Sequence, residues 1–384
     1  MDLRDSPPQA AFRAGLRAWL RANLPAPGGP PPARDTVALR RFSELLHTAG
    51  YAGLTWPVQY GGRGLAPAFQ AIYAEESALA EAPDQLNVIG LNMVGPTLIA
   101  HGTPAQRERY LPGILSGTVL FCQGFSEPDA GSDLAAVRTR AVGVPGGYRL
   151  HGEKVWSSYA HLADHCLLLA RTGPAGSRHH GLTCFLLDLH AAGVTVAPLR
   201  QLSGDTDFNQ IRLDDVAVAD ADVVGEVGGG WRVAMATLAH ERGTFGVTLT
   251  ARLSVVFDRL LATVRHTGRA SDPRVRHEVA AIYTVLQGLR HTGYRALGAL
   301  AASGEPGPES SVLKLVWSAT NQRIGALALE LLGGAAALDG RDALWGGYWQ
   351  HHRLRSRANS IEGGTSEILR SVIAERVLRL PRSR

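Results

Sequence analysis

Two short segments of the chain carry residue types that suit the binding of a flat, phosphorylated molecule. The first reads Phe121-Cys-Gln-Gly-Phe-Ser-Glu-Pro-Asp-Ala-Gly-Ser-Asp133 and passes from an apolar strand into a loop of turn-forming and hydroxyl residues. The second, Lys154-Val-Trp-Ser-Ser158, places one large aromatic plane beside two further hydroxyls. A heterocycle with carbonyls along one edge and a phosphate tail would fit both segments. Taken singly, either segment is more simply a surface turn beside a core tryptophan.

Three more segments of distinctive composition occur along the chain. They read Leu54-Thr-Trp-Pro-Val-Gln-Tyr-Gly-Gly-Arg-Gly64, Gly228-Gly-Gly-Trp231 and Ile361-Glu-Gly-Gly-Thr-Ser-Glu-Ile368. Together with the first two segments they resemble the signature of the acyl-CoA dehydrogenase family, in the family's order and over nearly the whole chain. In that family a Ser-Glu-Pro-x-Ala-Gly-Ser-Asp loop and a Trp-x-Ser strand hold FAD. The resemblance implies a flavoprotein that oxidises acyl thioesters to trans-2-enoyl thioesters.

The resemblance also implies a carboxylate base, which removes a proton next to the thioester, at one of two places. The first place immediately precedes Gly-Thr near the C-terminus; this chain has Gly363 there, and Glu362 stands one residue early, where many relatives have tyrosine. The second place precedes an arginine on the first helix of the C-terminal region, where the chain has Glu241 and Arg242. We therefore expect Glu241 to be the base and Glu362 its rival, with Arg242 and Glu362 beside the substrate. Gly363 is expected to offer its backbone N–H to the thioester carbonyl.

The helical pattern around Glu241 supports this choice. Position 241 falls on a stripe of apolar residues at intervals of three and four: Trp231, Ala234/Met235, Leu238, Phe245, Leu249 and Leu253. A carboxylate on a packed face is costly unless it is paired or neutral, and desolvation raises its pKa. A raised pKa suits a base that acts on a weakly acidic carbon. The alternative is a structural ion pair near the helix surface.

Five residues of the first two segments match flavin positions of the family. Phe125, Ser126 and Ser132 match loop positions that meet the isoalloxazine and the pyrophosphate side, and Ser132 also borders the substrate. Trp156 and Ser158 match the aromatic wall and the hydroxyl near flavin N5. The resemblance thus implies that the loop and the strand enclose the ring system of FAD.

The adenosine half of FAD has a less complete set of matches. Thr365 and Glu367 match positions near the adenosine. The family's Arg-x-x-Phe-Gly element, which crosses between subunits to the FAD phosphates, is incomplete, because Arg265-His-Thr-Gly268-Arg269 stands there without the phenylalanine. Arg269 is the candidate substitute. The resemblance further implies a homodimer or homotetramer, an acyl-CoA or acyl-carrier-protein substrate, and an electron-transfer flavoprotein as acceptor.

Composition excludes several other classes. The chain has 384 residues, and no uninterrupted apolar run approaches the ~20 residues of a membrane helix. The formal charge of +5 fits a solvated surface or attraction for an anionic ligand, and no basic run is interleaved with aromatics, so neither a nucleic acid nor a membrane is expected as a partner. Cys122, Cys166 and Cys184 show no metal-ligand or redox spacing, so no metal is expected. A charged, proline-bearing start without an apolar signal core makes a cytoplasmic protein the simplest interpretation.

The pattern of elements predicts an α+β multidomain fold that positions these residues. Residues 1–118 are mostly helical, with helical patterns at 8–24, 35–49, 66–82, 90–101 and 104–116. Residues 119–225 contain short runs rich in β-branched and aromatic residues, which predict an antiparallel β-barrel or sandwich. Residues 226–384 return to helical periodicity at 231–265, 273–302, 308–339 and 342–380, which predicts a C-terminal four-helix bundle.

Two other functions remain open on the same scaffold. Flavin oxidases and monooxygenases often lack the carboxylate base, so Glu241 argues against them. A non-catalytic partner subunit of a heteromeric dehydrogenase would need no flavin loop, so the complete loop and Trp156 argue against it. The acyl group stays open among fatty, branched, aromatic and steroid-side-chain types, because scattered side chains set the depth of the cavity. Glu362 in the place of a tyrosine indicates a more polar cavity.

Overall fold

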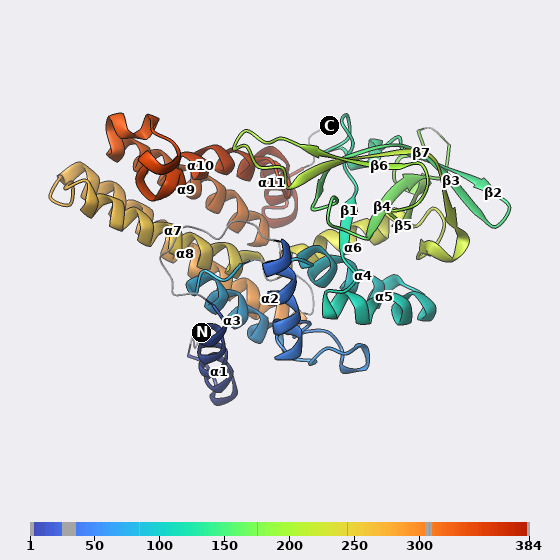
Figure 1. Cartoon of the computed structure of the whole chain (residues 1–384), viewed down its shortest axis with the longest axis horizontal. Coiled ribbons are helices and arrows are strands. Elements are labelled where there is room, and N and C mark those ends of the chain that lie inside the picture. Colours follow the sequence, from blue (N-terminus) through green and yellow to red (C-terminus); the bar gives the residue numbers. More distant parts are fainter. Residues whose placement is uncertain are drawn as a thin grey trace. The chain divides into compact units, whose positions relative to one another are not determined.

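The computed structural model describes residues 4–24, 36–83, 85–174, 176–243, 245–303, 307 and 309–381, without the side chains of residues 241–245, 303, 309 and 310. Its internal contacts divide the chain into two units that alternate along the sequence. The helical unit comprises Met1–Ala33, Leu65–Pro83 and Arg242–Arg384. The sheet unit comprises Arg34–Gly64 and Asp84–Glu241. Figure 1 labels the elements of both.

The sheet unit is built on one eight-stranded sheet (Figure 1). Its strands are β1 (Phe121–Gly124), β2 (Arg140–Val144), β3 (Gly147–Ser158), β4 (His165–Arg171), β5 (Leu182–Asp188), β6 (Val194–Leu199), β7 (Phe208–Ala219) and β8 (Val223–Val224). They follow the order β6-β7-β3-β2-β4-β5-β8, with β1 also paired to β4. Most pairs are antiparallel, as predicted, but β1 and β2 run parallel to β4, so the sheet is mixed. Parallel pairing requires a long connection between the partners, which the loop after β1 with the β2–β3 hairpin supplies for β1, and strand β3 with its flanking turns supplies for β2.

The interior of strand β4, residues 166–170, is apolar because both faces of the sheet are covered. Leu167 and Leu169 belong to a core that also contains Leu98 and Leu111 of the helices α4 (Gly95–His101) and α5 (Pro104–Ser116). The alternate β4 residues, including Leu168, belong to a second core shared with strands β3 and β7. A strand buried on both faces lacks the polar alternation of a surface strand. The apolar run in the sequence is therefore explained by packing on two sides.

The remaining helices of the sheet unit are α2 (Thr36–Thr48) and α6 (Gly230–Gly243). Helix α5 begins with a capping box, in which the Thr103 hydroxyl accepts from the N–H of Gln106 and the Gln106 side chain accepts from the N–H of Thr103. Before α4 the chain makes a π-turn, Gly90–Val94. Pro96 has no N–H to give to the Leu91 carbonyl, which instead accepts from the indole N–H of Trp56 at 3.1 Å. The indole of Trp56 thus supplies the hydrogen bond that Pro96 cannot donate.

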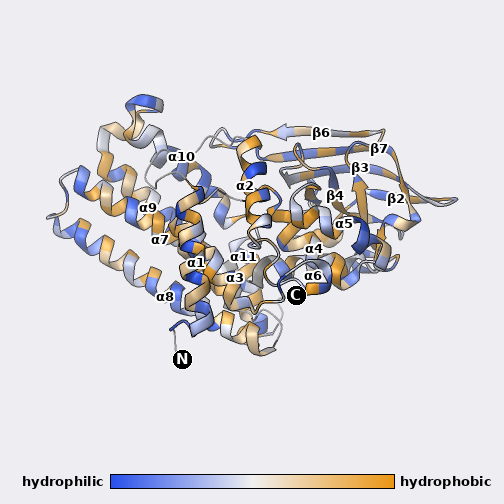
Figure 2. Cartoon of the chain, turned by 60° about the horizontal axis from the view of Figure 1, so that its bottom comes forward, coloured by the Kyte–Doolittle hydropathy of each residue, from blue (hydrophilic) through white to orange (hydrophobic). Residues whose placement is uncertain are grey.

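The helical unit contains three long helices that lie side by side (Figure 1). They are α7 (Phe245–His266), α8 (Pro273–Ser303) and α9 (Glu309–Leu332), joined by the shorter α1 (Pro7–Asn23), α3 (Pro67–Leu79), α10 (Tyr348–Arg355) and α11 (Ser366–Val372). Figure 2 shows apolar and polar residues alternating along the long helices, as amphipathic packing requires. Their buried core includes Leu260, Ile282, Ile324 and Trp349. A helical C-terminal bundle is therefore confirmed.

Two predicted helices of this region are divided in the structure. The pattern over 231–265 forms two helices, α6 and α7, with Gly243 as the last residue of α6. The pattern over 342–380 forms only short helices, because Trp345, Gly346, Gly363 and Gly364 adopt a left-handed backbone that no α-helix continues through. The second correction matters for function, since one interruption lies in the segment of residues 361–365.

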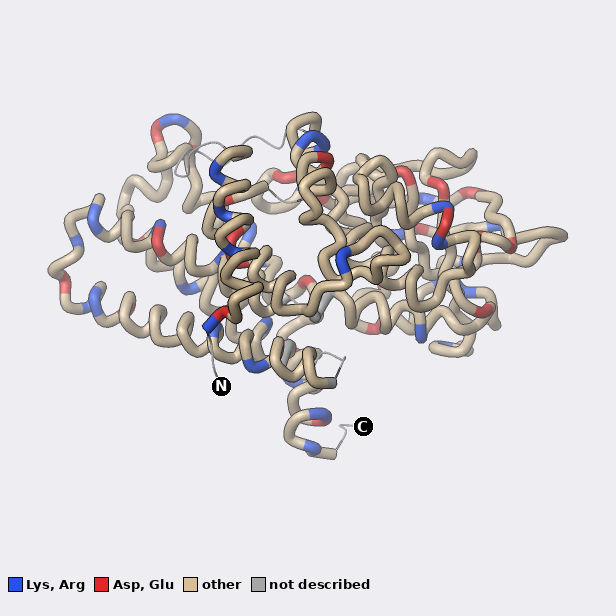
Figure 3. Tube along the Cα trace, turned by 90° about the horizontal axis from the view of Figure 1, so that it is seen from below, with Lys and Arg blue, Asp and Glu red and all other residues tan. Residues whose placement is uncertain are grey.

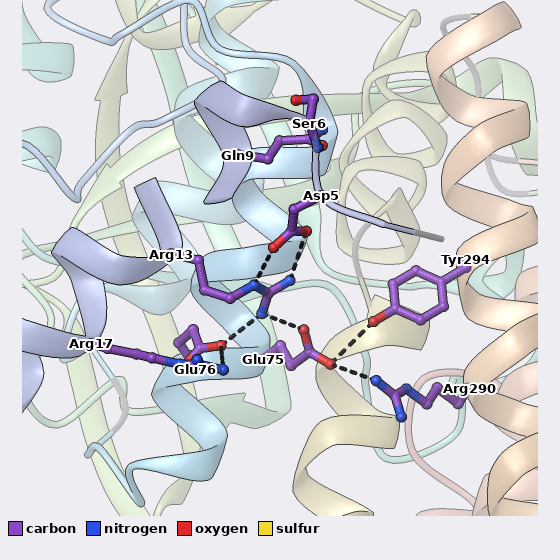
Figure 4. Close-up of polar contacts among 9 residues, drawn as sticks. All are labelled: Asp5, Ser6, Gln9, Arg13, Arg17, Glu75, Glu76, Arg290 and Tyr294. Atoms are coloured by element: carbon purple, nitrogen blue, oxygen red, sulfur yellow. Dashed lines mark hydrogen bonds and ion pairs between the residues drawn. The ribbon is translucent and has the colours of Figure 1, made fainter. Parts of the chain in front are cut away.

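An ion-pair cluster fastens α1 within the helical unit (Figure 4). The guanidinium of Arg13 donates to Asp5 at 2.6 Å, to Glu75 at 2.7 Å and to Glu76 at 2.6 Å. Glu75 also accepts from the hydroxyl of Tyr294 on α8 at 3.1 Å. The hydrogen bond from Arg13 lowers the pKa of Asp5, and hydrogen bonds to these carboxylates raise the pKa of Arg13. The cluster therefore ties the N-terminal helix to α3, and α3 to α8.

Charges of both signs are spread along the trace rather than gathered in one stretch (Figure 3). Within the described residues, no helix is long and apolar enough to cross a membrane. The same residues include no group of three or more His, Cys, Asp and Glu side chains arranged to hold a metal ion.

Candidate functional site

The loop after β1, residues 125–133, closes on itself before it returns to the sheet. Glu127 and Ala130 exchange two backbone hydrogen bonds of 3.1 Å, and Val155 of β3 donates to the Ser126 carbonyl at 3.0 Å. Phe125 is buried in the core, whereas Ser126 is half-buried and Ser132 is exposed. The loop therefore presents hydroxyls and backbone at its surface, and Phe125 contributes packing and its backbone.

A buried ion pair lies beneath this loop. The ammonium of Lys154 donates to Glu127 at 2.8 Å and to the Phe125 carbonyl at 2.9 Å, and the N–H groups of Arg138 and Thr139 also donate to the Glu127 carboxylate. Burial alone would raise the pKa of Glu127, but the charge of Lys154 and these donors lower it. Burial lowers the pKa of Lys154, and the charge of Glu127 opposes that shift. The loop and strand β3 are thus joined by a carboxylate and an ammonium that satisfy each other.

Trp156 lies next to this pair, where β3 contains an irregularity between Lys154 and Ser157. Its backbone φ is +60° and its side chain is 60% exposed, a strained conformation that presents an aromatic face to the surface. Ser157 beside it has a buried hydroxyl without a hydrogen-bond partner among the described residues, and so has the side-chain oxygen of Asn209. Ser158 is half-buried and pairs with Phe208 of β7. The exposed aromatic side chain and the loop hydroxyls fit a flat ring system with polar edges.

In the helical unit, the turn of residues 361–365 carries the second set of predicted residues. Gly363 and Gly364 have φ values of +60° and +99°, which side chains other than glycine rarely adopt. Thr365 then caps α11, its hydroxyl accepting from the N–H of Ile368 at 3.3 Å. Glu367, in the first turn of α11, is exposed and lies 3.7 Å from Arg370. The backbone therefore departs from helical geometry at Gly363 and Gly364, and a new helix, α11, begins after Thr365.

Glu362 is engaged in contacts within its own segment. Its carboxylate accepts from the side-chain amide of Asn359 at 2.7 Å and from the guanidinium of Arg355 at 3.0 Å. Asn359 in turn accepts from Asn321 of α9 at 2.8 Å. These contacts give Glu362 a role in holding the turn.

Side chains on one face of helix α9 form hydrogen bonds with the same turn and with Asn359 just before it. Lys314, Ser318 and Asn321 are spaced by four and three residues, which aligns them along the helix. The ammonium of Lys314 donates to the Gly364 carbonyl at 2.6 Å, and the hydroxyl of Ser318 donates to the Asn359 carbonyl at 2.7 Å. The left-handed glycines are thus fixed by side chains rather than by a ladder of backbone hydrogen bonds.

Glu241 and Arg242 occupy the last turn of α6, and their side chains fall outside the described residues. Position 241 follows Leu238 by three residues and Thr237 by four, so it lies on the face of α6 that carries both. Thr237 is fully buried, and its hydroxyl lies 2.9 Å from the hydroxyl of Thr97 on α4. The predicted base therefore stands one turn beyond a buried polar contact.

Arg269 follows α7, in the connection to α8. Its guanidinium forms an ion pair with Asp272, whose carboxylate also accepts from the N–H of Arg274 at 2.9 Å. The structure thus assembles Phe125, Ser126, Ser132, Trp156 and Ser158 in the sheet unit. It assembles Glu362, Gly363, Thr365 and Glu367 in the helical unit, with Arg269 on a different connection of that unit.

Family sequence models cover nearly the whole chain. The N-terminal domain of acyl-CoA dehydrogenase matches residues 6–118, the middle domain residues 122–216, and the C-terminal domain residues 228–378. The chain belongs to the acyl-CoA dehydrogenase family. The predicted family and the order of helical, β and helical regions are confirmed. This acyl-CoA dehydrogenase is thus an FAD-dependent oxidoreductase that acts on CH–CH groups.

Individual relatives match over their full length. Acyl-CoA dehydrogenase IpdE1 of Mycolicibacterium smegmatis is 40% identical over 390 residues, with 97% of each chain covered. IpdE1 of Mycobacterium tuberculosis is 41% identical over 382 residues, again with 97% of each covered. Among solved structures, the Tcur3481-Tcur3483 steroid ACAD has a TM-score of 0.88 at 30% identity, with 100% of both chains covered. The ChsE4-ChsE5 complex from Mycobacterium tuberculosis has a TM-score of 0.86 at 27% identity, also with 100% of both covered.

Within this acyl-CoA dehydrogenase, the residues that fit FAD best are those of the sheet unit. Trp156 would face the ring system, and Ser126, Ser132 and Ser158 would supply hydroxyls to its polar edges. The sequence patterns gave no role to Lys154 and none to Lys314, although each holds a loop of the site. The one signal that would have found them is the scarcity of lysine in the chain.

Proposed function

We propose that this acyl-CoA dehydrogenase converts an acyl thioester to the trans-2-enoyl thioester, with Glu241 as the base. FAD, when bound, supplies the acceptor for the hydride that leaves the β carbon. The chain itself must remove the α proton, stabilise the charge that develops on the thioester carbonyl, and exclude water. The observation that carries the proposal is the state of Glu362, which is committed to Arg355 and Asn359.

The choice of base follows from what each carboxylate is free to do. A base needs a lone pair directed at the α proton, and both oxygens of Glu362 already accept hydrogen bonds. Position 241 follows buried Thr237 by four residues on α6, and burial of a carboxylate raises its proton affinity. We assign Arg242 to the substrate side, next to the base in the sequence.

Stabilisation of the carbonyl charge is assigned to the turn of residues 361–365. A backbone N–H is a fixed donor that needs no reorganisation during reaction. Gly363 is our candidate for this donor, because its left-handed backbone interrupts the helical ladder that would otherwise use the N–H. Ser132, exposed on its loop, is assigned to the border between FAD and substrate.

For the acyl group we propose a steroid-derived acid carried as a CoA thioester. The support is the Tcur3481-Tcur3483 steroid ACAD, a neighbour at 30% identity over the full chain. Anaerobic mixing of the oxidised protein with steroid-derived, fatty and branched acyl-CoA thioesters and acyl-carrier thioesters tests this assignment. Fastest flavin bleaching by a fatty acyl-CoA would reject it.

For partners we propose an oligomer in which a second subunit contacts the FAD phosphates, and an electron-transfer flavoprotein as acceptor. Two neighbours are named as pairs of proteins, Tcur3481-Tcur3483 and ChsE4-ChsE5, so a second, related chain is a candidate besides a homodimer or homotetramer. Arg269, paired with Asp272, is the residue of this chain proposed for the phosphates. Native mass spectrometry of the FAD-loaded protein decides the stoichiometry.

The cytoplasmic location and the domain boundaries near residues 118 and 225 stay predictions. Cell fractionation tests the location, and limited proteolysis tests the boundaries.

The decisive experiment is Glu241→Gln. We expect the variant to bind FAD as the parent does, but to bleach it at least ~10²-fold more slowly with substrate, because a general base is removed. Bleaching at the parental rate would exclude Glu241 as the base. Oxygen uptake by the reduced parent enzyme distinguishes an oxidase or monooxygenase, and a purified protein without flavin absorbance would favour a non-catalytic subunit.

A further inference from the structure

The chain contains only two lysines, Lys154 and Lys314, among its 39 lysine and arginine residues. Both are buried, with 0% and 4% of their surface exposed. None of the arginines whose side chains are described is buried to that degree. The sequence therefore uses arginine for every basic position at the surface and keeps lysine for two interior positions.

The two lysines make the same kind of contact. Lys154 donates to the carbonyl of Phe125 at 2.9 Å, at the start of loop 125–133. Lys314 donates to the carbonyl of Gly364 at 2.6 Å, inside the turn of residues 361–365. Each contact joins a regular element, β3 or α9, to a distant irregular segment that carries predicted site residues.

The chemistry of the side chain explains why lysine is used at these two positions. An ammonium is compact and directs three donors from one atom, so it can hold a carbonyl in a space that a planar guanidinium with five donors would overfill. A buried cation is costly unless neighbouring acceptors surround it. Such a side chain restricts a loop, because movement of the carbonyl removes one acceptor from a buried cation.

We propose that Lys154 and Lys314 are the positioning residues of the site. Lys154 sets the loop that holds FAD, and Lys314 sets the turn that presents the Gly363 N–H. The second half rests on the proposed function, whereas the first requires only that FAD binds. Neither lysine touches the reacting atoms in this assignment, and each acts through a backbone carbonyl.

The first test measures FAD affinity of the full-length protein by flavin fluorescence after removal and re-addition of FAD. Lys154→Met alone leaves Glu127 as an unpaired buried charge, so the informative variant is Lys154→Met with Glu127→Gln. We expect the dissociation constant for FAD to rise at least ~10-fold in the double variant, with the apoprotein still folded by circular dichroism. The single variant Lys154→Arg, which keeps the charge, should not reach the parental affinity for FAD. The matched control is Arg149→Met, which removes an exposed cation paired with Asp215.

An unchanged FAD dissociation constant in the double variant would overturn the role of Lys154, whatever its effect on melting temperature. A variant that fails to fold as apoprotein is replaced by Lys154→Gln with Glu127→Gln, and the same criterion applies.

The second test uses hydrogen–deuterium exchange of the FAD-loaded enzyme, which requires no substrate. In Lys314→Met and Lys314→Arg, amides of residues 361–366 should exchange at least ~10-fold faster, while exchange in α8 stays at the parental rate. Arg274→Met, an exposed cation paired with Glu330, is the control. With a substrate in hand, the same variants should slow flavin bleaching at saturating substrate. Parental exchange in the turn would reject the assignment even if the enzyme proves to have another substrate.

Discussion

Loop 125–133 of the sheet unit and the turn of residues 361–365 of the helical unit are both irregular segments held by a buried lysine, but they are stabilised differently. Under the loop, the lysine is paired with a carboxylate, Glu127, which is itself buried. At the turn, the carboxylate is Glu362, whose pair with Arg355 is about one-third exposed on each side. The loop is therefore held through a fully buried ion pair, and the turn through the hydrogen bond from Lys314 to the Gly364 carbonyl together with a partly exposed ion pair.

The two segments also differ in how they reach a left-handed backbone. The strand beside the loop places Trp156 at a φ of +60°, where an aromatic side chain is strained. The turn places glycine at Gly363 and Gly364, where there is no such strain. Of these two sites, only the one in the strand carries a side chain in this conformation, which fits the proposed contact of Trp156 with the cofactor.

The largest expected effect comes from removing the anionic half of the buried pair. In Glu127→Gln the Lys154 ammonium loses its counter-charge inside the core, so we expect the free energy of unfolding to fall by about 3–5 kcal/mol. Denaturant unfolding of the apoprotein measures it. Adding Lys154→Met should recover much of the loss, because no buried charge is then left unpaired. A loss below ~1 kcal/mol in the single variant would mean that the pair is solvated, and the contrast with the turn would fail.

As the pH is lowered, the helical unit should lose stability before the Glu127–Lys154 pair does. Burial lowers the pKa of His352 on α10 to about 4, partly opposed by a backbone hydrogen bond with Asn321. The unfolded chain takes up this proton near pH 6.5 and the folded chain only near 4. Lowering the pH through that window therefore favours unfolding, by about 3 kcal/mol at its lower end. The pKa of Glu127 is lowered instead, so its contribution is lost only as the pH falls below the range of an ordinary carboxyl.

Comparison of unfolding at pH 7 and pH 4.5 checks this prediction. His352→Gln should flatten the pH dependence between 6.5 and 4, and His351→Gln, an exposed neighbour, should not. Equal slopes in the two variants would show that His352 is not the group responsible.

Local sequence signals predicted much of this structure, and contacts distant in the sequence supplied the rest. The helix predicted over residues 104–116 is confirmed as α5, because its periodicity and the cap that starts it depend on residues close together in the sequence. The interruption at Gly363 and Gly364 was hidden inside a helical pattern, because apolar periodicity does not register a left-handed backbone. The roles of Lys154 and Lys314 depend on carbonyls 29 and 50 residues away in the sequence. Local sequence patterns do not extend over such separations.

A reciprocal pair of substitutions should separate the two left-handed sites. Gly364→Ala places a Cβ on a backbone at a φ of +99°, so we expect a loss of about 1–2 kcal/mol in unfolding free energy. Trp156→Gly relieves strain but adds chain entropy, so apoprotein stability should change by less than ~1 kcal/mol while FAD retention falls. Gly334→Ala, with open space around its Cβ, is the control. A large loss in apoprotein stability from Trp156→Gly would instead assign the tryptophan to the core.

The smallest expected effect is that of Glu362→Gln, and it decides between the two candidate bases. The amide keeps an acceptor for Arg355 and Asn359, and a pair this exposed contributes at most about 1 kcal/mol, so stability should barely change. Flavin bleaching by substrate should stay within ~10-fold of the parental rate, because only the position of the turn is affected. If Glu362→Gln abolished bleaching while Glu241→Gln did not, the turn would carry the base. Glu362 would then act in the chemistry, and the turn would differ from the loop, whose carboxylate Glu127 only holds the fold together.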